Sequence, residues 1–146
     1  MLSKQEIFDK CAVHLMTQGK KATKDGGSRI CMYRAPDGTM CAVGGLIPDH
    51  LYTSSMEGNS VCGLFQNFAP EMSRAGLDIS CMSLLQGLQI IHDDYPPSDW
   101  RMRLAQVADY FVLSTAVLDA TPLMTPEAAT GRCVSDTPNF TEVVYA

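Results

Sequence analysis

Residues 31–52, CMYRAPDGTMCAVGGLIPDHLY, constrain the fold more than any other stretch of the chain. Residues 35–38 read Ala-Pro-Asp-Gly, a turn signature in which proline presets φ and glycine accepts a left-handed conformation. The flanking segments 29–34 and 39–43 alternate polar and apolar residues, which predicts two antiparallel strands. The glycine pair at 44–45 removes side chains where a backbone approaches closely or the chain turns sharply. We therefore expect a β-hairpin that leads into a tightly packed segment.

Helical patterns surround this hairpin. Ser3 and Glu6 form an S-x-x-E capping box before a stripe of apolar residues over 3–18, and Gly19 supplies a stop. Residues 98–111 carry the cleanest amphipathic pattern in the chain. Its apolar stripe consists of Trp100, Leu104, Val107, Ala108 and Phe111.

These patterns predict an α+β fold: a mostly helical single domain with a small antiparallel β-hairpin packed on three to four helices. We place this globular domain at residues 1–118 of the 146-residue chain. Residues 119–146 are broken by prolines and end in an apolar run, so we expect an irregular tail that forms an edge strand or a docking segment.

Composition and charge exclude several classes of function. The net charge of -5 and the thin spread of basic residues argue against a nucleic-acid partner, because phosphate binding needs a clustered basic surface. No apolar run has the roughly 20 residues of a membrane-spanning helix, so we expect a soluble protein. No basic segment followed by an apolar run opens the chain, so we expect its six cysteines to be reduced.

One catalytic hypothesis takes Cys41 as a nucleophile, His92 as its general base, and Asp93 or Asp94 as the residue that orients the base. A thiol needs a neighbouring base or a positive field to ionise at neutral pH. Neighbouring residues on a helix point about 100° apart, however, so His92 and Asp93 are not spaced like a base and its orienting acid. Cysteine in such a segment is more often a small buried apolar residue.

Two binding hypotheses use other residues of the same region. Gly44 and Gly45, with Arg34, could hold a phosphate or nucleotide through exposed amides, although a glycine pair alone is a weak signal. A metal site has the right ligand types but matches no zinc framework, so we expect neither a metal nor a cofactor. Its four ligands would be Cys31, Cys41, His50 and His92.

The stretch at residues 31–52, here called the core motif, resembles small uncharacterised proteins of tailed bacteriophages and prophages. The resemblance extends to the N-terminal helix IFDKCAVHLMTQGKKA, the MEGNSV loop and the segment LQIIHDDYPPSDW. The resemblance covers about residues 5–113. More distantly, CAVGGL at residues 41–46 and His92-Asp93 are similar to an actinobacterial domain of unknown function that has Asn-Asp at the latter position. Histidine in place of asparagine argues against an indispensable base there. The resemblance implies a phage origin and a fold, and no reaction.

We therefore expect a phage accessory protein that works by binding in the host cytoplasm, where it inhibits a host protein such as a defence component. One alternative is a protein that sequesters a small nucleotide signal near Arg34, Gly44 and Gly45. The other is a cysteine-dependent hydrolase that uses Cys41.

Overall fold

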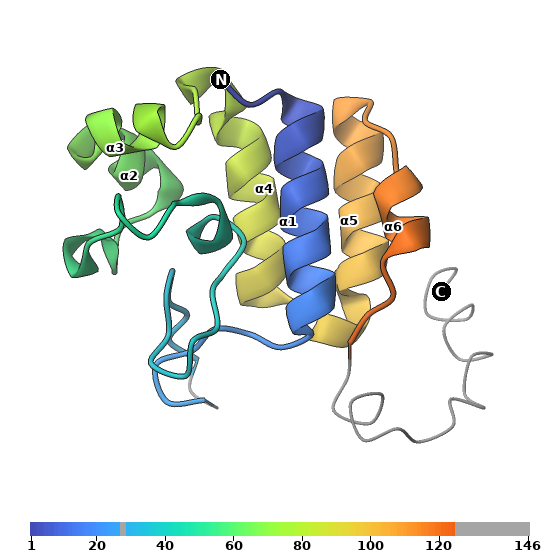
Figure 1. Cartoon of the computed structure of the whole chain (residues 1–146). Helices are drawn as coiled ribbons and strands as arrows, with labels where there is room; N and C mark the ends of the chain where they lie inside the picture. Colours follow the sequence, from blue (N-terminus) through green and yellow to red (C-terminus); the bar gives the residue numbers. More distant parts are fainter. Residues whose placement is uncertain (27–28, 125–146) are drawn as a thin grey trace.

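The computed structural model describes residues 1–26 and 29–124, which fold into a mostly helical domain (Figure 1). Three long helices, α1 (Lys4–Gln18), α4 (Met82–Asp94) and α5 (Pro97–Phe111), each contact the other two. Every helix in these two described stretches is too short or too polar to cross a lipid bilayer. The shorter elements are η1 (Gly44–Leu46), η2 (Ser54–Met56), α2 (Val61–Asn67), α3 (Ala69–Arg74), η3 (Ile79–Cys81) and α6 (Ala116–Ala120).

The ends of α1 confirm its predicted capping. The Ser3 hydroxyl oxygen accepts a hydrogen bond from the Glu6 amide at 3.1 Å. Gly19 ends the helix in the left-handed region, at φ 67°, which is why a glycine stands there. The buried face of α1 consists of the predicted stripe and Met16; the residues of the stripe are Ile7, Phe8, Cys11, Ala12 and Leu15.

Helices α4 and α5 form an antiparallel pair beside α1 (Figure 1). Helix α5 buries Trp100, Leu104 and Ala108, three members of the predicted stripe. The indole nitrogen of Trp100 donates to the carbonyl oxygen of Tyr95 at 3.0 Å, which satisfies the one polar atom of this fully buried side chain. The core residues of α4 are Leu84, Leu85, Leu88, Ile91 and His92.

The predicted α+β class, with a β-hairpin packed on the helices, is wrong. Within residues 1–26 and 29–124 the structure has no strand. Antiparallel pairing there is limited to two isolated bridges, Thr23 with Cys31 and Arg34 with Met40. The turn at 35–38 does form, because its last amide donates to its first carbonyl oxygen at 3.0 Å. The correct local turn therefore does not extend into a strand pair.

Two of the backbone amides that would extend the pairing around the Arg34–Met40 bridge, those of Tyr33 and Thr39, donate to side chains instead. The Glu57 carboxylate accepts from the amides of Tyr33 at 2.8 Å and Arg34 at 3.0 Å. On the other arm, the Thr39 amide donates to the Asp37 carboxylate at 3.0 Å, and the Met40 amide, which faces away from the first arm, donates to the Gln18 side chain at 2.9 Å. A backbone donor bonded to a side chain is withdrawn from the regular pairing of strands. The segment is therefore a loop held by α1 and by the residue after η2.

The folded part of the chain continues past the predicted domain boundary at residue 118. Helix α6 crosses that boundary, and Leu118 and Leu123 are both buried. The Met124 amide donates to the Met16 carbonyl oxygen at 2.8 Å, which joins the chain to the end of α1. The remainder of the predicted edge strand or docking segment, residues 125–146, lies outside the described residues.

Candidate functional site

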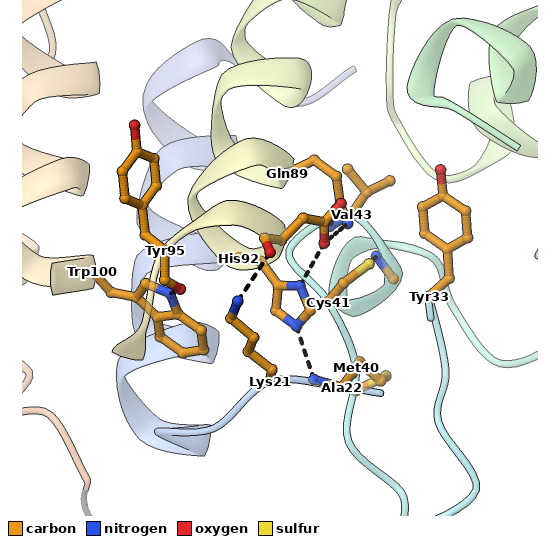
Figure 2. A network of polar contacts seen from close by, with 12 residues as sticks. Lys21, Ala22, Tyr33, Met40, Cys41, Val43, Gln89, His92, Tyr95 and Trp100 are labelled. Atoms are coloured by element: carbon orange, nitrogen blue, oxygen red, sulfur yellow. Dashed lines mark hydrogen bonds and ion pairs between the residues drawn. The ribbon is translucent and has the colours of Figure 1, made fainter. Parts of the chain in front are cut away.

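His92 is the centre of a polar network at the C-terminal end of α4 (Figure 2). Its side chain is completely buried. The Ala22 amide donates to Nε2 at 2.9 Å, and Nδ1 lies 2.7 Å from a carboxylate oxygen of Asp93. A backbone N–H can only donate, so Nε2 is an acceptor and Nδ1 carries the proton that it donates to Asp93. The imidazole is therefore neutral, with both nitrogens engaged.

The same network ties two loops to α4. Gln89 donates from its amide nitrogen to Asp93 Oδ1 at 3.0 Å and accepts from the Val43 amide at 3.2 Å. The Lys21 ammonium donates to the backbone carbonyl of Asp93 at 2.9 Å. The Trp100 ring stacks on His92 with a centroid separation of 5.8 Å. These contacts satisfy buried polar groups and fix the loops that flank the predicted turn.

Cys41, the nucleophile of the catalytic hypothesis, is fully buried. Its Sγ accepts a hydrogen bond from the Gly44 amide at 3.3 Å. Removal from water nevertheless dominates and raises the pKa of the thiol to about 12. At neutral pH the sulfur is therefore a protonated, weakly nucleophilic thiol.

Cys41 and His92, the thiol and the base of the catalytic hypothesis, lie in one region of the molecule (Figure 2). His92 and Asp93 do form a hydrogen bond, although their adjacency on a helix predicts diverging side chains. His92 cannot act as the base in this arrangement, because its acceptor nitrogen, which would take a proton from Cys41, already accepts a hydrogen bond from the Ala22 amide. The arrangement serves to connect loops to a helix, and it contains no group poised to activate the thiol.

A different cluster has the ligand types for a metal. The ligand atoms of Cys31, His92 and Asp93 all lie within 4.8 Å of one another. A metal on His92 Nδ1 would move the proton to Nε2, where it would face the donating Ala22 amide. Burial, followed by the Asp93 charge, raises the pKa of the Cys31 thiol to about 11, which favours its protonated form. These hydrogen bonds hold the cluster in a form that does not suit a metal. His50, from the sequence-based metal hypothesis, is exposed.

The residues of the phosphate hypothesis are committed to internal contacts. The Arg34 guanidinium bonds the Asp49 carboxylate and the Ile47 carbonyl, and it lies 4.8 Å from the centre of the Tyr52 ring. The Gly45 amide donates to the Cys41 carbonyl at 3.0 Å, and the Gly44 amide is bonded to the sulfur of the same residue.

Close packing explains why glycines stand at both positions. A Cβ on Gly44 would lie 2.0 Å from the Tyr33 carbonyl oxygen. A Cβ on Gly45 would lie 2.8 Å from the His14 ring. Both distances are far below ordinary contact, so the glycine pair permits a close approach, as the sequence suggested.

Three side chains that organise this region were not among the candidates: Gln18, Glu57 and Gln89. Each bonds the backbone of a segment more than 20 residues away in sequence. No periodicity or motif singles them out, because their roles depend on which loop folds against them. The only local hint is that Glu57 precedes a glycine in an otherwise uncharged loop.

A pocket of about 540 Å³ opens beside the network. Its polar lining includes Gln86, Gln89, Asp93 and Asp94 from α4, with Asn59 and Ser60 from the loop before α2. Ile90, Val61 and Met32 supply apolar surface. This volume is in the range of ligand pockets.

Comparison of the chain with family models, with curated proteins and with solved structures finds no match.

Proposed function

We propose that this protein is a phage accessory protein that acts by binding a host protein in the host cytoplasm and inhibiting it. A defence component is the expected kind of target. The phage origin comes from the resemblance of the core motif and its neighbouring segments to phage and prophage proteins.

The state of Cys41 is the observation that carries a binding function over an enzymatic one. Its thiol is fully buried, its pKa is raised to about 12, and the nearest candidate base has both nitrogens engaged. A nucleophile needs access to its substrate and a route to ionisation, and this sulfur has neither. The internal contacts of Arg34, Gly44 and Gly45 likewise favour a binding surface over phosphate capture.

A pull-down from host cells tests the proposal. The full chain with an affinity tag is expressed in a bacterial host, before and after infection, and the retained proteins are identified by mass spectrometry. We expect one host protein to be retained in near-stoichiometric amount and to lose its activity when the purified pair is reconstituted.

Cys41→Ser and Cys41→Ala are the matched controls, because both remove the thiol from the same buried position. Variants that keep the native helical signal should retain and inhibit the host protein as well as the wild type does. Failure to retain any host protein, or loss of the effect in both folded variants, would contradict the proposed function.

A further inference from the structure

We propose that a groove along α4 and α5 is a docking surface for an amphipathic helix of the partner protein, with a basic residue of that helix seated at its acidic end. The α4–α5 groove is lined on α4 by Ser83, Gln86, Gly87 and Ile90, and on α5 by Arg103, Gln106, Val107, Tyr110 and Phe111. This inference rests on the proposed function and names the surface and the kind of partner segment.

The groove lies on a side of the helix pair that the core uses only in part: Ile91, which also lines it, is buried, and Val107 and Phe111 are partly buried against the core. Gln86, Gly87 and Ile90 follow Ser83 by three, four and seven positions, so these four of the five α4 residues in the lining share one face of the helix. The buried residues Leu84, Leu85 and Leu88 lie on a different face, toward the core. Helix α1 packs against both α4 and α5 through the core, which leaves this second side of the helix pair uncovered among the described residues.

Apolar surface is exposed in the groove. The exposed fraction is 50% for Ile90 and 81% for Tyr110. Gly87 has no side chain, and a Cβ there would lie 3.8 Å from the nearest Val107 methyl, so the backbone of α4 forms part of the floor. The volume of this hollow is about 480 Å³. Exposed apolar side chains along a concave surface are typical of a site that buries a partner.

The acidic end of the groove is the pocket beside the His92 network. The two hollows share Gln86 and Ile90, so they form one strip along α4. Within the described part of the chain, the pocket is lined by Asp93 and Asp94 and by no lysine or arginine. The nearby Lys21 ammonium donates to the backbone carbonyl of Asp93. The C-terminal end of α4 adds the negative end of a helix dipole, so a cation is favoured there.

Among the residues that the structure describes, the cation that lines the groove is Arg103 of α5. The Arg103 guanidinium lies 4.0 Å from the centre of the Tyr95 ring and donates to the Gln106 side chain at 3.2 Å. It therefore reaches from α5 to Tyr95, the residue that follows Asp94 at the end of α4. The charges specify an orientation: a basic residue of the partner toward Asp94, and its apolar residues along Ile90 and Tyr110.

The shape of the strip favours a helix as its occupant. A groove between two antiparallel helices accepts the ridge of a third helix, as the core side of this pair accepts α1. A second copy of this chain would place an acidic protein, with net charge -5, against the same two carboxylates. Charge complementarity therefore favours a different protein with a basic segment.

The test uses a library of randomised helical peptides selected against the immobilised full-length protein. We expect enriched peptides with apolar residues at i, i+3 or i+4, and i+7, followed or preceded by lysine or arginine. Ile90→Lys should weaken their binding about tenfold or more, as for a central apolar contact. Asp94→Lys should favour peptides with an acidic residue in place of the basic one.

Each variant has a matched control outside both hollows. Ile79→Lys changes another exposed isoleucine, with an exposed fraction of 64%, on η3. Asp109→Lys makes the same charge change at an exposed position of α5. Both controls should bind the selected peptides as the wild type does. Thermal melts monitor folding, and Ile90→Ser replaces Ile90→Lys if the latter fails to fold.

Several outcomes would overturn the docking surface. The first is that no helical peptides are enriched, and the second is that the wild type selects acidic peptides. The third is that the Ile90 and Asp94 variants bind the selected peptides as tightly as the wild type does. Concentration-dependent dimerisation that Ile90→Lys abolishes would show that a second copy of the chain occupies the groove. That result would also contradict the proposal of a basic partner helix. If the host protein from the pull-down binds all variants equally, the docking surface is wrong and the proposed function stands. If no host protein is retained, the proposed function fails whatever the peptides show.

Discussion

Glu57→Gln is a nearly isosteric change that should destabilise the fold by an amount that the structure allows us to estimate. The carboxylate accepts from the Tyr33 amide through one oxygen and from the Arg34 amide through the other. The second oxygen also accepts from the Tyr52 hydroxyl at 2.6 Å. Glutamine keeps one oxygen and replaces the other with an NH₂ group, which would face a donor.

The magnitude follows from the loss of one charged acceptor and the weakening of the other. A hydrogen bond to a charged group contributes about 1.5–3 kcal/mol, and an unsatisfied buried donor costs a similar amount. Glu57 is half-buried, so water partly replaces the lost acceptor. We expect the free energy of unfolding to fall by about 2 kcal/mol, a large part of the roughly 5–15 kcal/mol typical of a domain.

Urea unfolding followed by tryptophan fluorescence measures this change, because the single tryptophan, Trp100, is fully buried. Glu71→Gln in α3 is the matched control, and we expect its effect to stay within about 0.5 kcal/mol. An equally small effect of Glu57→Gln would refute the argument that this carboxylate holds the loop in place of a strand ladder.

Three further predictions concern the buried network and the glycines. His92→Phe keeps a ring beside Trp100 but leaves the Ala22 amide and Asp93 without their partner. The free energy of unfolding, measured with urea, should therefore fall by about 2–4 kcal/mol, whereas substitutions at exposed positions change it little. Burial raises the pKa of Cys41 from 9.0 to about 12, so the stability that its protonated thiol contributes is fully present below pH 9.0 and is lost as the pH rises toward about 12. Cys41→Ala should therefore lose less stability than the wild type between these two pH values. Parallel profiles of unfolding free energy against pH would contradict the assignment. Gly44→Ala should destabilise the fold by about 3 kcal/mol or more, because its Cβ would lie 2.0 Å from a backbone oxygen. Gly87→Ala lies inside a helix and its Cβ would have 3.8 Å of clearance, so it should stabilise the fold by about 0.5–1 kcal/mol. Thermal melts in which both variants shift the melting temperature in the same direction would contradict this comparison.

Local sequence patterns predicted the features whose causes lie within a few residues. The capping residues Ser3 and Gly19 mark the ends of α1, because each satisfies or redirects the backbone of its own helix. The apolar stripes of α1 and α5 name most of their buried residues, since helical periodicity follows from geometry alone. The turn at 35–38 forms for the same local reason.

The strands flanking that turn were predicted wrongly because their fate depends on distant residues. Whether the amide of Tyr33 joins a ladder depends on Glu57, which no local pattern connects to it. The hydrogen bond between neighbouring His92 and Asp93 also departs from expectation, since the last turn of α4 meets the loop that contains Ala22 there.

The sequence by itself determined where helices begin, which faces they bury and where the chain can turn, because those choices are governed by contacts between near neighbours. Only the tertiary structure decided that Cys41 is a buried, protonated thiol and that His92 is a neutral connector. It also decided that residues 1–26 and 29–124 leave one side of the α4 and α5 pair uncovered. Burial, proton position and surface shape depend on which distant segments meet, and a linear pattern does not contain that information.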